Sequence, residues 1–127
     1  MFEKLELTRM AQALAAHAGA RMGVIARNVA HADTPGFKAQ DLPEFSAVFE
    51  RSGESMRGTR PGHFTSASRM EEMQTERAPG REAPNGNTVS LEGEMVKSVG
   101  ARQSHEMALA VYRATSDVIR ASLGRSR

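Results

Sequence analysis

The sequence predicts an all-α fold: two long terminal helices that pair as an antiparallel, coiled-coil-like hairpin, with a long irregular or partly disordered segment between them. Apolar residues recur every three or four positions near both ends of the chain, whereas Pro and Gly repeatedly interrupt the middle. Only 39% of the 127 residues are apolar and 5% are aromatic, so Ala, Met and Val must form a small core between closely spaced helices.

The first helix is expected to run from Glu3 to Ala32. Its apolar residues fall on one face: Leu7, Met10, Leu14, Ala18, Met22, Ile25 and Val29. Consecutive steps of four shift this stripe toward an 11-residue repeat, which predicts straight or slightly right-handed packing. Thr34 should lie outside the helix because the residue before a proline, here Pro35, is driven out of the α region. Residues 1–37 therefore form the first unit.

Residues 38–88 form the second unit and carry no sustained periodicity. Turn-forming residues stand at Pro43, Gly53, Gly58, Pro61, Gly62, Pro79, Gly80, Pro84 and Gly86. Loops in compact domains reach roughly 12 to 15 residues, so this longer segment is either disordered or ordered only by partners. We favour ordering on assembly, because the short apolar islands at 45–49 and at Phe64 are too sparse to offset chain entropy in a monomer.

The second helix is expected from Leu91 to Leu123, within a third unit of residues 89–127. Ser90 is a plausible N-cap, and the acidic residues Glu92 and Glu94 suit the positive first turn of a helix. Gly124 marks the end of the helix.

Two stripes run along the second helix. The first contains Leu91, Met95, Val99, Gln103, Met107, Ala110, Ala114, Val118 and Ala121, and the second contains His105, Leu109, Tyr112, Ser116, Ile119 and Leu123. We expect the first stripe to pack within the chain, in a contact that joins Leu14, Met22, Ile25 and Val29 to Val99, Met107 and Val118. The first helix covers only one face, so the second stripe is expected to contact another subunit. The alternative is one wide apolar face in a monomer.

No residue set points to an enzyme, a metal site or a cofactor. The chain has no Cys, which excludes disulfides and thiolate ligands. The histidines lie at His17, His31, His63 and His105, without the close spacing of metal ligands. The acidic pairs Asp41 with Glu44 and Glu71 with Glu72 lie in the irregular segment, where nothing holds a general acid and base at a fixed separation. We expect no catalytic residue, no metal and no cofactor.

Charge and hydropathy restrict the possible partners. A small basic nucleic-acid-binding protein is an alternative from another class, with phosphate contacts from Arg51, Arg57, Arg60 and Arg69. Interleaved glutamates cancel that field, and the net charge is only +2. The N-terminal residues do not form a cleavable secretory signal, and no apolar run approaches the roughly 20 residues of a membrane span.

One segment carries a specific motif at the end of the first helix. It contains Asn28, Ala30, His31, Thr34, Pro35, Gly36, Phe37 and Lys38. The segment resembles the N-x-A-N-x-x-T-x-G-[FY]-K motif of flagellar axial proteins, the rod, hook and filament-junction subunits. His31 stands where that family normally has Asn, whose expected role is to cap or bond the backbone at the helix end; a neutral His can still make one hydrogen bond.

Within that superfamily, the chain resembles the FlgB family of proximal rod proteins. The resemblance rests on chain length, on residues 59–64 (TRPGHF) and on residues 119–125 (IRASLGR). It implies a structural subunit of the bacterial flagellar basal-body rod that self-assembles through its terminal helices and transmits torque. Another short rod subunit, FlgC-like, is the alternative, although residues 107–116 do not reproduce its MxxARxYxxN-like helix.

The resemblance also implies partners and a location. The partners are other copies of the chain, other rod proteins, membrane-ring and rod-adaptor proteins at the rod base, and the export apparatus, with no nucleic acid and no direct membrane insertion. The location is the periplasm-spanning rod, reached by type III export without signal cleavage. Phe45 and Phe49 resemble the Phe-x-x-x-apolar element read at the export gate; the alternative is that they pack as one face of a helical turn.

Overall fold

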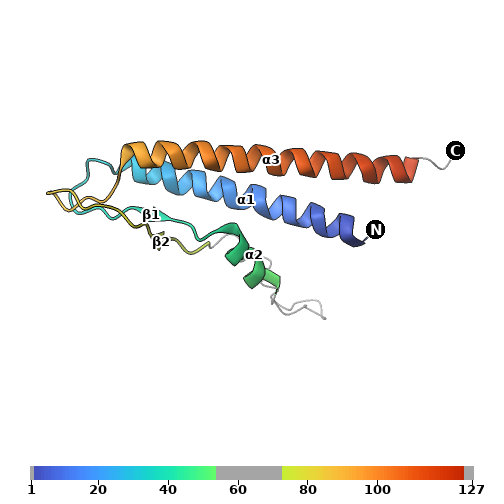
Figure 1. Ribbon diagram of the computed structural model, residues 1–127, viewed down its shortest axis with the longest axis horizontal. Helices are drawn as coiled ribbons and strands as arrows, with labels where there is room; N and C mark the ends of the chain where they lie inside the picture. The colour runs from blue at the N-terminus through green and yellow to red at the C-terminus, as the bar shows by residue number, and fades with distance from the viewer. Residues whose placement is uncertain (1, 54–72, 125–127) are drawn as a thin grey trace, which may run out of the picture.

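The computed structural model describes residues 2–53 and 73–124 and contains two long helices side by side (Figure 1). The elements are α1 (Phe2–Ala30), β1 (Gln40–Asp41), α2 (Phe45–Gly53), β2 (Glu76–Arg77) and α3 (Leu91–Gly124). The chain termini lie at the same end of the molecule, so α1 and α3 are antiparallel (Figure 1). At about 1.5 Å per residue, the 34 residues of α3 span roughly 51 Å. The predicted fold class is confirmed.

Local hydrogen bonds mark the start of α3 and the end of α1. Ser90 is the N-cap of α3: the Gly93 N–H donates to its Oγ at 3.3 Å, and the Glu94 N–H donates to its carbonyl at 2.8 Å. The first helix ends at Ala30, two residues earlier than expected, and continues as turns in which the His31 N–H bonds the Arg27 carbonyl at 3.1 Å. The proline therefore follows the helix end by several residues.

Small side chains form the seam between α1 and α3. The buried residues on this seam are Ala11, Ala18 and Ile25 of α1, and Glu94, Ala101, Ala108 and Thr115 of α3. Each set repeats every seven residues, which is the coiled-coil period, so the expected 11-residue repeat is wrong. The expected stripe was defined by the large apolar side chains, several of which are exposed. The observed seam is formed mainly by alanines, which allow the two helices to approach closely.

The burial of the two stripes of α3 differs from the prediction. Val99, Met107 and Val118 are 67%, 56% and 48% exposed, so the prediction that they form the packing face against α1 is wrong. On α1, Ile25 is buried, Leu14 and Met22 are half-buried, and Val29 is exposed.

The second stripe of α3 lies along the buried seam. His105, Leu109, Tyr112, Ser116 and Ile119 are half-buried beside it, and Leu123 at the end of the helix is exposed. These residues are therefore partly covered within one chain. A contact of their exposed edge with another subunit stays a prediction.

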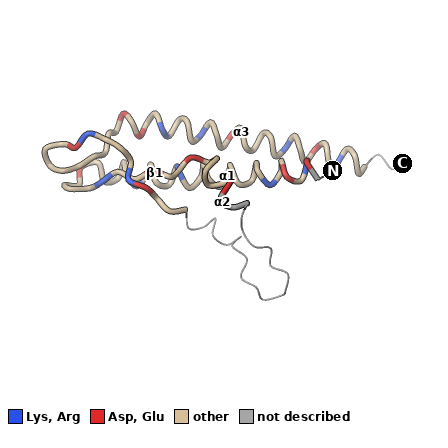
Figure 2. The backbone as a smooth tube through the Cα atoms, turned by 60° about the horizontal axis from the view of Figure 1, so that its bottom comes forward, with Lys and Arg blue, Asp and Glu red and all other residues tan. Residues whose placement is uncertain are grey.

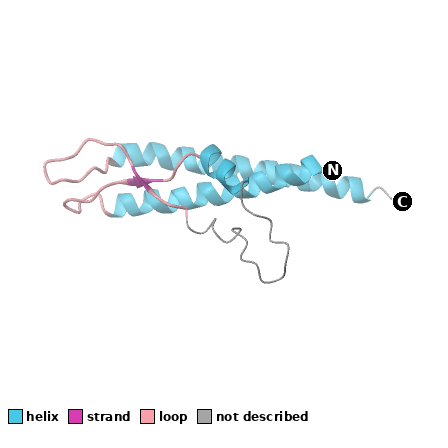
Figure 3. Cartoon of the chain, turned by 90° about the horizontal axis from the view of Figure 1, so that it is seen from below, coloured by secondary structure: helices cyan, strands magenta, loops and turns pink. Residues whose placement is uncertain are grey.

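Part of the middle segment forms an arm against α1. We define the arm as residues 40–53, which include β1 and α2. β1 pairs antiparallel with β2, with Gln40 opposite Arg77 and Asp41 opposite Glu76. The arm lies along α1 and leaves the outer side of α3 uncovered (Figures 1 and 3). Phe64, His63, Glu71, Glu72 and the arginines 57, 60 and 69 lie outside the described residues, and ordering on assembly stays a prediction.

Charged residues of both signs are distributed along α3, whereas the acidic residues of α1, Glu3 and Glu6, lie only in its first two turns (Figure 2). Beneath the arm, α1 buries Ala13, His17 and Val24 on a side different from the α3 seam. Within residues 2–53 and 73–124, no helix is both long and apolar enough to cross a membrane.

Candidate functional site: the closed tip and its polar network

The motif residues at the end of α1 are joined to a second loop that lies far away in sequence. We call residues 31–39 and 80–89 together the closed tip. The Gly36 N–H donates to the Asn85 carbonyl at 2.9 Å, and the Thr88 N–H donates to the Phe37 carbonyl at 3.1 Å. The Ala39 N–H donates to the Thr88 Oγ1 at 2.8 Å. The motif is therefore one half of a two-loop structure that ties the two long helices together.

Asn87 is the central polar residue of the closed tip. Its side-chain Nδ2 lies 2.9, 2.8 and 2.9 Å from the backbone carbonyls of His31, Ala32 and Thr34. Its Oδ1 accepts the Val89 N–H at 2.7 Å, and the residue is only 3% exposed. These carbonyls belong to the turn that follows α1, and those of His31 and Thr34 also accept backbone N–H groups, so Asn87 ties this turn to the loop before α3. The sequence pattern did not identify this residue and indicated only a turn at its neighbours.

Two glycines adopt left-handed backbone conformations where the two loops cross. Gly36 has a φ of 74° and Gly86 a φ of 82°, values that residues with a Cβ rarely adopt. A Cβ built on Gly86 would also lie 3.3 Å from the Gly36 Cα. Glycine at position 86 therefore meets both a conformational and a steric requirement of the closed tip.

The remaining motif side chains line the outside of the closed tip. The His31 ring stacks on Phe37 with centroids 4.6 Å apart, and its Nδ1 lies 3.2 Å from the Thr34 Oγ1. The His31 ring thus bonds a side chain, while Asn87 bonds the carbonyls of the turn that follows α1. Lys38 forms an ion pair with Glu82 at 2.8 Å and donates to the Gly86 carbonyl at 2.9 Å. Ala30 and Pro35 are exposed.

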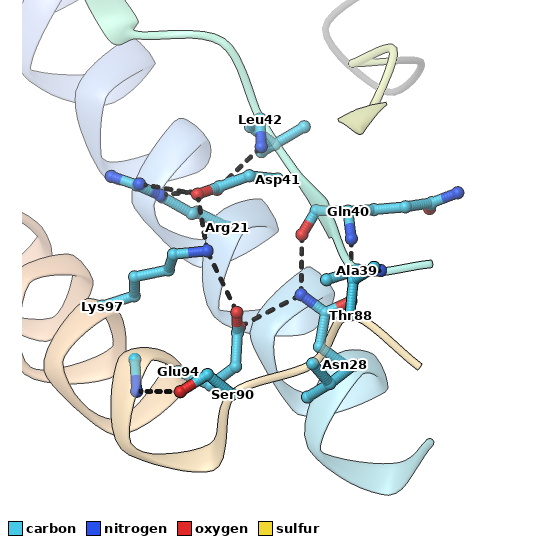
Figure 4. Close-up of polar contacts among 12 residues, drawn as sticks. Arg21, Asn28, Ala39, Gln40, Asp41, Leu42, Thr88, Ser90, Glu94 and Lys97 are labelled. Atoms are coloured by element: carbon cyan, nitrogen blue, oxygen red, sulfur yellow. Dashed lines mark hydrogen bonds and ion pairs between the residues drawn. The ribbon is translucent and has the colours of Figure 1, made fainter. Parts of the chain in front are cut away.

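A buried polar network lies where the last turns of α1, the arm and the first turns of α3 meet (Figure 4). Asn28, 1% exposed, donates to the Gln40 carbonyl at 2.6 Å and to the Glu94 Oε2 at 3.1 Å, and its Oδ1 accepts the Gln40 N–H at 3.1 Å. Glu94, 2% exposed, also accepts from the Lys97 Nζ at 3.0 Å. One motif residue, Asn28, therefore connects three elements.

Asp41 forms the other half of this network. Arg21 donates to both of its carboxylate oxygens at 2.9 Å, and the Leu42 N–H donates to Oδ1 at 2.8 Å. Burial raises the pKa of Asp41, but the hydrogen bonds from Arg21 and Leu42, with the charges of Arg21 and Lys97, outweigh that effect and lower the pKa overall. The hydrogen bond to Asp41 in turn raises the pKa of Arg21. The carboxylate is therefore held in its charged form.

Phe45 and Phe49 lie on α2, where Phe45 contacts α1. The His17 Nε2 lies 2.8 Å from the Pro43 carbonyl, which only accepts, so this nitrogen carries the proton. The His17 and Phe45 rings meet edge to face at 5.8 Å, and the Phe45 and Phe49 rings lie 5.4 Å apart. A cleft of about 290 Å³ lies beside His17 and Phe45, and Leu14 and Ala101 also line it. Packing of this element on α1 is observed; its recognition at an export gate stays a prediction.

No group of three or more His, Asp or Glu side chains within the described ranges is arranged to hold a metal ion. The described site is instead a set of structural contacts. These contacts fix the position of α3 relative to α1, and they leave the outer side of the helix pair uncovered.

Comparison with known proteins finds similarity to a flagellar rod protein. A comparison with models of known protein families finds no match. The chain is 27% identical over 111 residues to the flagellar basal body rod protein FlgB of Agrobacterium fabrum (strain C58), and the alignment covers 83% of each protein. The similarity therefore extends over most of both proteins.

Proposed function

We propose that this chain is a structural, non-enzymatic subunit of the bacterial flagellar basal-body rod, in its proximal part. The observation that carries the proposal is the similarity to a rod protein over most of both chains. The closed tip adds support, because it gives the residues of the axial-protein motif defined structural roles. Rod assembly through the terminal helices and transmission of torque belong to the same proposal.

A rod subunit must resist twisting, and the polar network provides a means. Packed interiors switch between discrete arrangements and do not deform continuously. Sliding α3 along α1 would break the hydrogen bond between Asn28 and Glu94. Asn28 would keep its bonds to Gln40, and Glu94 its bond to Lys97, so the cost is that of one hydrogen bond to a charged group, about 1.5–3 kcal/mol. The network therefore favours a single register of the two helices.

The exposed apolar side chains of α3 support assembly with neighbours. Met95, Val96 and Val99 are 66%, 74% and 67% exposed, and large exposed apolar patches mark interaction sites. We propose that these side chains, with the exposed edge of the second stripe, contact other copies and other rod proteins. Membrane-ring and rod-adaptor proteins would meet the chain at the rod base.

We also propose how the chain reaches the rod. It is exported without signal cleavage, and Phe45 and Phe49 are recognised at the export gate. Recognition requires α2 to leave α1, because Phe45 packs on His17 in the folded chain.

Gene deletion with complementation tests the proposed function. In the bacterium that encodes the chain, deletion should abolish motility and rod formation, and the wild-type gene should restore both. A matched variant, Val99→Asp, should be made and secreted but should not restore motility. A fully motile deletion strain with intact basal bodies would contradict the proposed function.

A further inference from the structure

The first turns of α3 expose a compact apolar surface. Leu91, Met95, Val96 and Val99 are 47%, 66%, 74% and 67% exposed, and we call these four residues the knob face. They point away from the seam with α1, whose buried residues on α3 include Glu94 and Ala101. The arm lies on the opposite side of the hairpin, along α1 (Figure 1). Nothing in the described chain covers the knob face.

The outer side of α1 has the complementary shape. Its exposed residues are Ala16, Gly19, Ala20, Gly23, Ala26 and Ala30, which we call the small face. A Cβ added to Gly19 or Gly23 would meet nothing within 4 Å, so the single chain has no steric need for either glycine. Glycine inside a helix is also less stable than alanine. A close neighbour outside the chain would explain both glycines.

The two faces also carry opposite charges. No acidic residue lies between Glu6 and Asp33, and Arg27 stands exposed beside the small face. Glu92 stands exposed within the knob face. Among the described residues, the side chains of Arg27 and Glu92 form no hydrogen bond and no ion pair.

We infer that the knob face of one copy docks on the small face of a second copy, with Glu92 paired to Arg27. The inference rests on the proposed self-assembly and names the surfaces that carry it. With the two helices antiparallel, pairing Glu92 with Arg27 brings Val96 opposite Gly23 and Val99 opposite Ala20. The large side chains of one helix then meet the smallest positions of the other. A parallel arrangement would instead bring Val96 opposite His31, beyond the end of α1.

This register fixes the relative direction of the copies. Within each chain α1 and α3 are already antiparallel, so antiparallel docking of α3 from one copy on α1 of the next makes both copies point the same way (Figure 3). The knob face and the small face lie on different helices and both face outward, so one chain cannot use them on itself. The contact is heterologous, so its repetition joins successive copies into a ring or an open row, depending on the rotation between neighbours.

Cysteine cross-linking tests this contact, because the natural chain contains no Cys. Purified full-length Ala20→Cys and Val99→Cys chains are mixed at high concentration and oxidised. The mixture should give a disulfide-linked pair, since facing positions fall within disulfide reach. Either variant alone should give none above the level of the control. The control mixture replaces Val99→Cys with Ser122→Cys, which lies near the other end of α3, and should also give none.

Charge reversal provides a second test that does not depend on sulfur geometry. Arg27→Glu alone and Glu92→Arg alone should each weaken association by about two- to fivefold, because each contact then joins like charges. Mixing the two variants should restore association, since every contact between one variant and the other again joins opposite charges. The change in association is measured by sedimentation of the full chain.

Each outcome separates this contact from the proposed function. Dimers of Val99→Cys alone would indicate a symmetric contact and overturn the inference, as would a mixture that stays uncrosslinked or a charge-reversed mixture that shows no recovery. If the gene restores motility while cross-links in cells avoid positions 20 and 99, the proposed function stands and this contact fails. If the cross-links form as expected but deletion leaves motility intact, the contact stands and the rod assignment fails.

Discussion

Asn87 donates to the carbonyl of Ala32, 55 residues earlier in the chain, at a distance of 2.8 Å. This contact joins the two halves of the closed tip and holds the loop before α3 against the turn that follows α1. It gives the axial-protein motif a structural function: to form one side of a closed joint between two long helices.

Removing the Asn87 carboxamide should open the closed tip. Asn87→Ala removes the partner of the Ala32 carbonyl and of the Val89 N–H, and should lower the free energy of unfolding by about 1–3 kcal/mol. Asn87→Asp should cost more, because a carboxylate oxygen would face carbonyl oxygens. Urea unfolding followed by circular dichroism measures the loss, and hydrogen exchange locates it at residues 31–39. Asn85→Ala, at an exposed neighbour, removes only one hydrogen bond to the Asn87 N–H and should cost less; an equal loss would contradict the role of the Asn87 side chain.

The Asp41 contacts should make stability depend on pH in the acid range. The folded-state pKa of Asp41 is lowered from its ordinary value of 3.8, so the unfolded chain binds more protons in this range. The stabilisation is complete above the ordinary pKa and is lost as the pH falls through the folded-state pKa. Urea unfolding at a series of pH values should show this loss, and Asp41→Asn should remove that share of the slope. An unchanged slope in Asp41→Asn would show that the ion pair with Arg21 does not form.

Charging the seam and charging the outer side of α3 should have separate effects. Ala108 is 1% exposed, so Ala108→Asp places a charge in the seam and should strongly lower the helicity of the isolated chain. Val99 is 67% exposed, so Val99→Asp should leave helicity unchanged and prevent assembly. Circular dichroism and sedimentation distinguish the two effects. If Val99→Asp unfolds the chain as severely as Ala108→Asp, the assignment of the seam is wrong.

The glycines of the small face should show opposite effects on stability and assembly. A Cβ at Gly23 meets nothing within 4 Å, so Gly23→Ala should stabilise the isolated chain by about 1 kcal/mol. Gly23→Leu should leave the fold intact but weaken association, because its side chain occupies the place of Val96 from a neighbour. Thermal unfolding measures the first effect and sedimentation the second. Unweakened association of Gly23→Leu would exclude close approach at this face.

The long helices were predictable from the sequence because their signals are local. The period of apolar residues, the Ser90 N-cap and Gly124 placed both helices to within two residues of their observed ends. The seam was not predictable in the same way, because large apolar residues were taken as the core, whereas Ala101 and Ala108 are buried and Val99 is exposed. Alanine has almost no hydrophobic signal of its own, and its seven-residue spacing is the pattern that would have identified it.

The polar network and the closed tip depend on contacts between distant residues. Asn28 was identified through the motif, but its partner Glu94 was expected only to suit the positive first turn of a helix. Asn87 had no distinguishing local pattern beyond the turn that precedes it. Sequence periodicity places residues on helix faces, but it does not pair loops that lie 50 residues apart.

The most direct test of the rod assignment is a density map of basal bodies isolated from the bacterium that encodes the chain. We expect paired α1 and α3 helices in the proximal rod, all chains pointing the same way, with Val99 covered by a neighbouring subunit. A proximal rod built without this chain, or chains whose α3 outer face remains open to solvent, would contradict the rod assignment.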